Sequence, residues 1–271
     1  MKFSIWSGFY IELSPEDMVL EFEKNDCAYS ELSGEHADVL LARGDPREVG
    51  REFKAFALAH GVSFPQGHLS LDARICREED REYVKRQLQM FDALGTKRAV
   101  LHVDRFRDVG GLSAEEMKTR NVAALCDLLE SIENTDLIIC LENIRSSPSV
   151  AQSAEELLWF ISELGSEHFG ICLDTGHLNL VENKDQGAFI RAAGKRLKAL
   201  HLADNDGIRN QHLMPNACGQ VDFAEVIREA EKVGYDGIYN YEISGERNVP
   251  LEIRSIKTDY IRRITEFYAK Q

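Results

Sequence analysis

The feature that most constrains the fold is a regular alternation of short apolar segments with longer amphipathic ones along the whole chain. The short segments have the composition of buried strands, and several are apolar on both faces, as in a parallel sheet covered by helices. Eight such strands are predicted, over residues 2–9, 27–32, 62–71, 98–104, 137–143, 169–174, 197–204 and 237–243. Strands that alternate with helices in this way favour an α/β fold.

The segments between the predicted strands begin and end with the residues typical of helix termini. Ser14 and Asp45 each precede a proline, which places a cap and an N1 proline ahead of an amphipathic stretch. Three further caps stand three residues before a glutamate, at the spacing of a capping box, namely Ser113, Ser153 and Asp222. Glycines that suit the position after a helix are Gly95, Gly165 and Gly234. We therefore expect helices in these intervals.

Eight strand–helix units in 271 residues predict a (β/α)8 TIM barrel, formed as one domain over residues 1–271. The alternative is an open, doubly wound sheet. That fold normally has a glycine-rich phosphate-binding turn after its first strand, and the sequence FYIELSPED at residues 9–17 is not such a turn.

Composition narrows the class of protein. The hydrophobic content of 44% is ample for a core, and the net charge of −14 argues against a nucleic-acid partner, because it repels phosphate backbones. The six cysteines form no C-x-x-C pair, which argues against a cysteine zinc site. No apolar run is long enough to span a membrane, and the N-terminus meets acidic residues too early for a signal peptide. We expect a cytoplasmic protein.

Polar side chains collect where the predicted strands end. Barrel enzymes carry their chemistry at the carboxyl ends of the strands. Five of the eight histidines lie at or just past such ends, namely His68, His102, His177, His201 and His212. Acids and an amide occupy the same places, namely Asp104, Glu142, Asn143, Asp174, Asp204 and Glu242. Closure of the barrel would bring these residues together although they are far apart in sequence.

Carboxylates and imidazoles together are ligands for Mn²⁺, Mg²⁺, Co²⁺ or Zn²⁺, and no thiolate is positioned to compete. A cluster of carboxylates without a cation would raise its own pKa values by repulsion. Individually, several of these residues have a structural alternative: Asp174 and Asp204 could cap turns, and Asn143 could orient Glu142 or touch a substrate. Considered together, they predict a divalent metal site.

Five motifs stand out at these strand ends, namely LEN at 141–143, LDTGH at 173–177, HLAD at 201–204, HLMPNACGQVDF at 212–223 and YEI at 241–243. Together they resemble the sugar phosphate isomerase/epimerase family, which belongs to the xylose-isomerase-like TIM barrels. The resemblance extends over essentially the whole chain and is clearest from residue 98 to residue 245. The order of glutamate, Asp-x-x-His, histidine and glutamate is fairly specific to this superfamily, but it does not identify a substrate.

The resemblance implies a function. Glu142, Asp174, His201 and Glu242 resemble the four metal ligands of ketose 3-epimerases, in which two glutamates act as acid and base through a metal-stabilised cis-enediolate. The resemblance further implies a substrate that is a sugar, a sugar phosphate or a related polyol. Residues interpreted as substrate-binding are His177, which resembles a substrate-contacting histidine, together with His68, His102, His212 and Arg209.

Alternative functions remain open at this stage. Endonuclease-IV-like enzymes, which cleave DNA at abasic sites with zinc, have histidines at the places of His68, His102, His177 and His212. In that family an aspartate is expected two residues before the last histidine, where this chain has Asn210. A keto-polyol dehydratase would use the same chemistry, and a non-catalytic sugar-binding barrel would need no acid and base. Homodimers are common among such barrels, although no interface is evident in the sequence.

Overall fold

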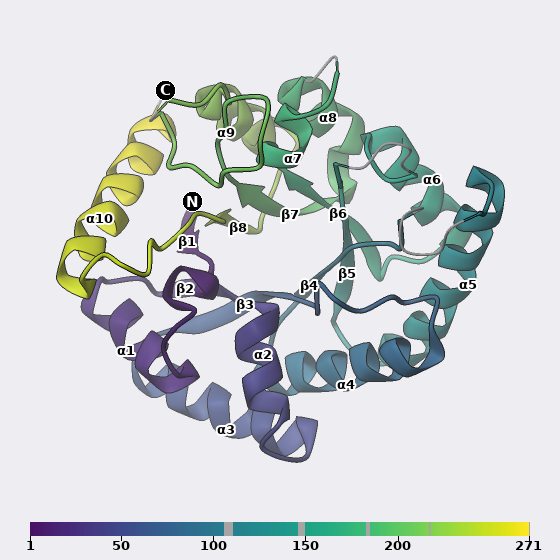
Figure 1. Ribbon diagram of the computed structural model, residues 1–271, viewed down its shortest axis with the longest axis horizontal. Helices are drawn as coiled ribbons and strands as arrows, with labels where there is room; N and C mark the ends of the chain where they lie inside the picture. The colour runs from purple at the N-terminus through teal and green to yellow at the C-terminus, as the bar shows by residue number, and fades with distance from the viewer. Residues whose placement is uncertain (106–110, 146–149, 183–184, 217, 271) are drawn as a thin grey trace.

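The computed structural model of the chain describes residues 1–105, 111–145, 150–182, 185–216 and 218–270. Its centre is a sheet of eight parallel strands in the order β1-β8-β7-β6-β5-β4-β3-β2. The strands are β1 (Lys2–Ile5), β2 (Tyr29–Leu32), β3 (Ser63–His68), β4 (Arg98–Leu101), β5 (Ile138–Glu142), β6 (Phe169–Asp174), β7 (Leu197–Leu202) and β8 (Ile238–Tyr241). They form a nearly closed barrel with helices around it, as Figure 1 shows, which confirms the predicted (β/α)8 TIM barrel.

The outer ring contains the helices that connect these strands. They are α1 (Pro15–Lys24), α2 (Gly34–Leu41), α3 (Pro46–Ala59), α4 (Glu78–Leu94), α5 (Ala114–Ile132), α6 (Ala154–Leu164), α7 (Thr175–Asn179), α8 (Gln186–Ala193), α9 (Phe223–Lys232) and α10 (Leu251–Tyr268), with 3-10 turns η1 (Ser7–Tyr10) and η3 (Gly194–Arg196). Ser113 and Ser153 form the predicted capping boxes, and Ser14, Asp45 and Asp222 accept hydrogen bonds from first-turn N–H groups. These caps confirm the predicted helix starts.

The barrel closes where β1 meets β2. All neighbouring strands in the sheet order, from β1 and β8 round to β3 and β2, are joined by parallel ladders of backbone hydrogen bonds. At the seam, the hydroxyl of Ser30 on β2 donates to the carbonyl oxygen of Ile5 on β1 over 2.7 Å. A side chain therefore helps to join the two strands.

Strand alternation decides which residues face the interior. In β6, Ile171 and Leu173 belong to the main hydrophobic core, whereas Cys172 packs in a separate small cluster with Val100, Cys140 and Ala199. Successive side chains of a strand point to opposite faces. Asp174, two residues after Cys172, therefore lies on the inward face, at the carboxyl end of the barrel and above this small apolar layer.

The first predicted strand is too long. Residues 7–9 of the predicted segment 2–9 belong instead to the 3-10 turn η1, and all four residues of that turn are buried. Apolar residues in a buried turn give the same sequence signal as residues in a buried strand. Within the described ranges, no helix is long and apolar enough to cross a membrane.

Candidate metal and active site

Four strands in succession place a possible cation ligand at the same end of the barrel. Glu142 and Asp174 are the last residues of β5 and β6, His201 is on β7, and Glu242 directly follows β8. All four are buried, and one donor atom from each lies within 4.8 Å of the others. The parallel sheet therefore brings together the four residues that the sequence predicts as ligands.

The imidazole of His201 is oriented towards two of these carboxylates. Its Nε2 atom lies 2.8 Å from a carboxylate oxygen of Glu31, which can only accept a hydrogen bond when ionised. Its Nδ1 atom lies 3.4 Å from Glu142 and 3.2 Å from Glu242. With Nε2 as the donor, the neutral ring directs the Nδ1 lone pair at two anionic groups, an arrangement that fits a cation between them.

Asp174 has both a structural and a potential ligand role. Its Oδ1 atom accepts a hydrogen bond from the backbone N–H of His177 over 2.7 Å and caps α7. Its Oδ2 atom is buried and has no hydrogen-bond partner among the described residues, like Nδ1 of His201. The side chain of Asn143 exchanges two hydrogen bonds with the backbone of Asp174, at 3.0 and 2.7 Å. These bonds fix Asp174, so Asn143 supports this residue rather than the carboxylate of Glu142.

Backbone carbonyls orient three further histidines. His68, His177 and His212 place Nδ1 within 2.6 to 3.0 Å of the carbonyl oxygens of Leu69, Asn143 and Glu242, respectively. Donation from Nδ1 leaves Nε2 as an acceptor or a ligand. In His68 this Nε2 atom lies 3.2 Å from the carboxylate of Glu142, which can only accept, so the two residues form a hydrogen bond when the His68 ring carries a proton on both nitrogens.

The remaining contacts extend the cluster on two sides. The Nε2 atom of His102 lies 2.9 Å from Glu142, so Glu142 is shared by several histidines. Towards the outside, the amide nitrogen of Asn210 lies 3.3 Å from Nε2 of His177 and 2.9 Å from Nε2 of His212. This amide connects the two rings at the point where the endonuclease-IV-like alternative expects a carboxylate.

Comparison with known proteins agrees with this arrangement. The model of the xylose isomerase-like TIM barrel family matches residues 22–263, which is most of the chain. The chain belongs to the xylose isomerase-like TIM barrel family. The matched range includes all four residues of the carboxylate and histidine cluster.

Relatives of this family member include named sugar epimerases. It is 28% identical to a D-psicose 3-epimerase of Enterocloster bolteae over 199 residues, which cover 69% of this chain and 63% of that protein. It is 24% identical to an uncharacterized protein of Methanocaldococcus jannaschii over 226 residues, which cover 83% and 76% of the two chains. A solved structure of D-psicose 3-epimerase with D-tagatose, from Clostridium cellulolyticum, has the same fold, with a TM-score of 0.83, 16% identity and 99% of both chains covered.

Opposing effects set the charge of the two glutamates in this family member. Burial acts to raise the pKa of Glu142, but the nearby His102 and His201 outweigh it and hold that pKa well below its usual range. Burial also acts against ionisation of Glu242, yet His201 and His212 lower its pKa to about 2. Both side chains are therefore carboxylates at neutral pH and are able to accept a proton.

The other charged groups balance these carboxylates. Burial raises the pKa of Asp174, and the charges of Glu142 and Glu242 raise it further. Burial acts to lower the pKa of His177, but Asp174 and Glu142 outweigh it and raise that pKa to about 10. The cluster thus attracts positive charge, which protons on histidines or a bound cation can supply.

A cavity of about 370 Å³ opens beside this cluster. Glu242 and His212 form part of its wall, and apolar residues of the first and third strand–helix units cover other parts, namely Trp6, Phe9, Ile11 and Leu71. Arg209 is mostly exposed, and its guanidinium group pairs with Asp206 over 3.2 Å. The structure therefore places His212 at the cavity and Arg209 on the surface of the following loop.

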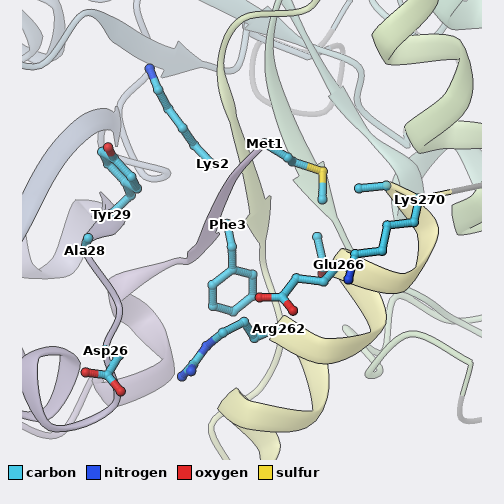
Figure 2. A pocket seen from close by; sticks show the side chains of 11 residues that line it. Met1, Lys2, Phe3, Asp26, Ala28, Tyr29, Arg262, Glu266 and Lys270 are labelled. Carbon is cyan, nitrogen blue, oxygen red and sulfur yellow. The ribbon is translucent and has the colours of Figure 1, made fainter.

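A second cavity, of about 360 Å³, lies at the opposite end of the barrel. Figure 2 shows Lys2 and Phe3 at the start of β1 together with Arg262 and Glu266 from α10 and Lys270, which follows that helix. Because active sites of TIM barrels lie at the carboxyl ends of the strands, we assign the candidate site to the first cavity.

Sequence reasoning missed two residues of the site. Glu31 lies inside the predicted strand 27–32 rather than at its end, so the strand-end pattern gave no reason to select it. The second is Cys172, which the sequence suggested only as a core residue and whose sulfur lies within 4.8 Å of donor atoms of Glu142 and His201. Burial raises the pKa of this thiol well above its usual range, which keeps it neutral, whereas a metal ligand would be the thiolate.

Proposed function

We propose that this protein is a sugar epimerase or isomerase that depends on a divalent cation held by Glu142, Asp174, His201 and Glu242. The observation that carries the proposal is the convergence of four buried donor atoms within 4.8 Å of one another. Two of these side chains have buried atoms without a hydrogen-bond partner in the described structure, Oδ2 of Asp174 and Nδ1 of His201. One imidazole and three carboxylates suit Mn²⁺, Mg²⁺, Co²⁺ or Zn²⁺.

The two glutamates are proposed to move the proton. When bound, a divalent cation would polarise the substrate carbonyl and stabilise the negative charge that develops during proton removal. Glu142 and Glu242 come from β5 and β8 and approach His201 Nδ1 at 3.4 and 3.2 Å. One carboxylate would accept the proton from the carbon beside the carbonyl. The second must already hold a proton taken from solvent and would return it to the other face of that carbon and invert it, after which the first would release its proton to solvent.

The histidines are proposed to bind the substrate. His212 lies at the cavity wall, and Asn210 joins its ring to that of His177. His68 and His102 contact Glu142 from β3 and from just after β4, so they are placed to orient this carboxylate as well as a substrate hydroxyl. Arg209, paired with Asp206, remains a candidate only for contacts at the entrance.

The charges around the cavity favour an unphosphorylated sugar. Its described lining includes three carboxylates, Glu35, Glu242 and Glu246, but a single guanidinium group, that of Arg247. A phosphate site would normally supply several cationic or N–H donors. We therefore infer a free ketose or a related neutral polyol as the substrate class.

A zinc-dependent abasic-site endonuclease is the second candidate. The observation that favours it is a further group of possible ligands, His68, His102 and Glu142, whose donor atoms also lie within 4.8 Å of one another. Against it stand the net charge of −14, which repels DNA, and the amide of Asn210 between two histidines where a ligand carboxylate is expected.

Metal analysis and an exchange assay together test these candidates. The protein, purified without added metal, is analysed by inductively coupled plasma mass spectrometry and then incubated in heavy water with a panel of ketoses. About one divalent cation per chain and deuterium at the carbon beside a ketose carbonyl would support the epimerase. About three zinc ions per chain and cleavage of abasic DNA would support the nuclease. Absence of cation binding would contradict both functions and would favour a non-catalytic sugar-binding barrel.

A further inference from the structure

We propose that Glu31 is a positioning residue, which fixes the tautomer and orientation of His201 and thereby sets the affinity of the protein for its cation. This inference rests on the proposed metal site. Glu31 lies on β2 and is fully buried, as is His201 on β7. The two residues are 170 positions apart in the sequence.

The hydrogen bonds of Glu31 determine the proton position on His201. The Oε2 atom of Glu31 lies 2.8 Å from Nε2 of His201 and also accepts a hydrogen bond from the side-chain amide of Gln66. Because an ionised carboxylate cannot donate, the proton of the neutral imidazole must be on Nε2. Nδ1 is then the free nitrogen, and it is the atom that faces Glu142 and Glu242.

His201 differs in this respect from its neighbours. His68, His177 and His212 are each held through Nδ1 by a backbone carbonyl, which leaves Nε2 for the site. In His201 the roles of the nitrogens are reversed. Its Nε2 atom points across the barrel to β2, where the strand carbonyls take part in the ladder with β3. A side-chain acceptor therefore replaces the backbone carbonyl.

The acceptor is a carboxylate although a neutral group could satisfy the same N–H. Complete burial of an ionised carboxylate is costly, so a purely structural partner for a histidine would more easily be an amide or a hydroxyl. A carboxylate behind a metal-binding imidazole makes the ring a stronger ligand and holds its plane.

The test compares cation affinity in variants of Glu31. Metal is removed from the full-length protein, and the Kd for Mn²⁺ is measured by competition with a fluorescent chelator. Glu31→Ala removes both the acceptor and the charge, and we expect a Kd about 10- to 100-fold higher, the usual effect of losing such a partner. Glu31→Gln keeps an acceptor oxygen, and we expect a smaller increase. The absorption spectrum of bound Co²⁺ should change in Glu31→Ala, because the imidazole is no longer held in one orientation, and should change less in Glu31→Gln.

Ser4→Ala is the matched control. Ser4 is also fully buried inside the barrel, and its hydroxyl group donates to Asn240 over 2.9 Å. Loss of this bond should lower the melting temperature without changing the Kd for Mn²⁺ or the Co²⁺ spectrum. If Glu31→Ala fails to fold, Glu31→Gln supplies the same comparison.

Two results would overturn the inference in distinguishable ways. A Glu31 variant that unfolds at lower temperature but binds Mn²⁺ with the affinity of the natural protein would show that Glu31 only stabilises the barrel. The metal site itself would stand in that case. Absence of cation binding by the unaltered protein would refute the metal site and the role of Glu31 together.

Discussion

Replacement of Asp174 by asparagine separates the two roles of this side chain. The substitution keeps an oxygen that can accept the hydrogen bond from the backbone N–H of His177, so the start of α7 should remain capped. It removes the negative charge that the cation would neutralise. Burial and the neighbouring carboxylates raise the pKa of Asp174, which means that its ionised form is disfavoured in the folded protein. We therefore expect metal-free Asp174→Asn to be at least as stable as the unaltered protein.

The loss of cation affinity can be estimated from the spacing of the donor atoms. The donor atoms lie within 4.8 Å of one another, so a cation among them is no farther than that from Asp174. Two unit charges at this distance interact by about 3.5 kcal/mol at an effective dielectric constant of 20. This energy corresponds to roughly 300-fold in the Kd. A cation concentration of 100 times the original Kd stabilises the unaltered protein by about 2.7 kcal/mol and would stabilise the variant by only about 0.2 kcal/mol.

Thermal unfolding with and without Mn²⁺ measures this difference. A deficit of about 2.5 kcal/mol lowers the cation-induced increase in Tm by roughly 5–10 °C in a protein of this size. Asp204→Asn is the control, because Asp204 is also buried after a strand and accepts backbone hydrogen bonds from Asn205, Gln220 and Val221. It should alter the metal-free Tm but not the increase caused by Mn²⁺. An Asp174→Asn protein with the full Mn²⁺-induced increase would refute the assignment of Asp174 as a ligand.

Three other outcomes are expected. Glu242→Gln should abolish interconversion of two epimeric ketoses, because each carboxylate is proposed to serve one face of the carbon, and an unchanged rate of epimerisation measured by NMR would contradict its role as acid and base. Affinity for Mn²⁺ should rise as the pH is raised towards about 10. The pKa of the proposed ligand His201 is raised well above its usual value, so a proton on this ring competes with the cation, and His177, with its pKa raised to about 10, loses a positive charge beside Asp174. A pH-independent Kd in calorimetry would argue against this. Asn143→Ala should lower the free energy of unfolding by about 2–5 kcal/mol, because two buried backbone groups of Asp174 lose their partners; urea denaturation measures this loss, and a change below about 1 kcal/mol would contradict it.

The sequence by itself determined the barrel and most of the candidate ligands. Strands and helices follow from local periodicity, and caps such as those at Ser113 and Ser153 mark the helix boundaries. The residues at the ends of parallel strands must share one face of a barrel. For this reason a cluster of acids and histidines could be proposed before any distance was known, and the family resemblance selected Glu142, Asp174, His201 and Glu242 from it.

Only the tertiary structure decided how these residues are arranged. Nδ1 is the free nitrogen of His201 because Nε2 contacts Glu31 on a strand across the barrel. Glu31 lies within its strand and not at the end, where the sequence pattern places site residues. The sulfur of Cys172 lies near the site because alternate residues of one strand point inwards. The side-chain conformation of Asp174 decides that one oxygen caps α7 while the other remains available to a cation. Such features arise from contacts between distant segments, which local sequence patterns do not encode.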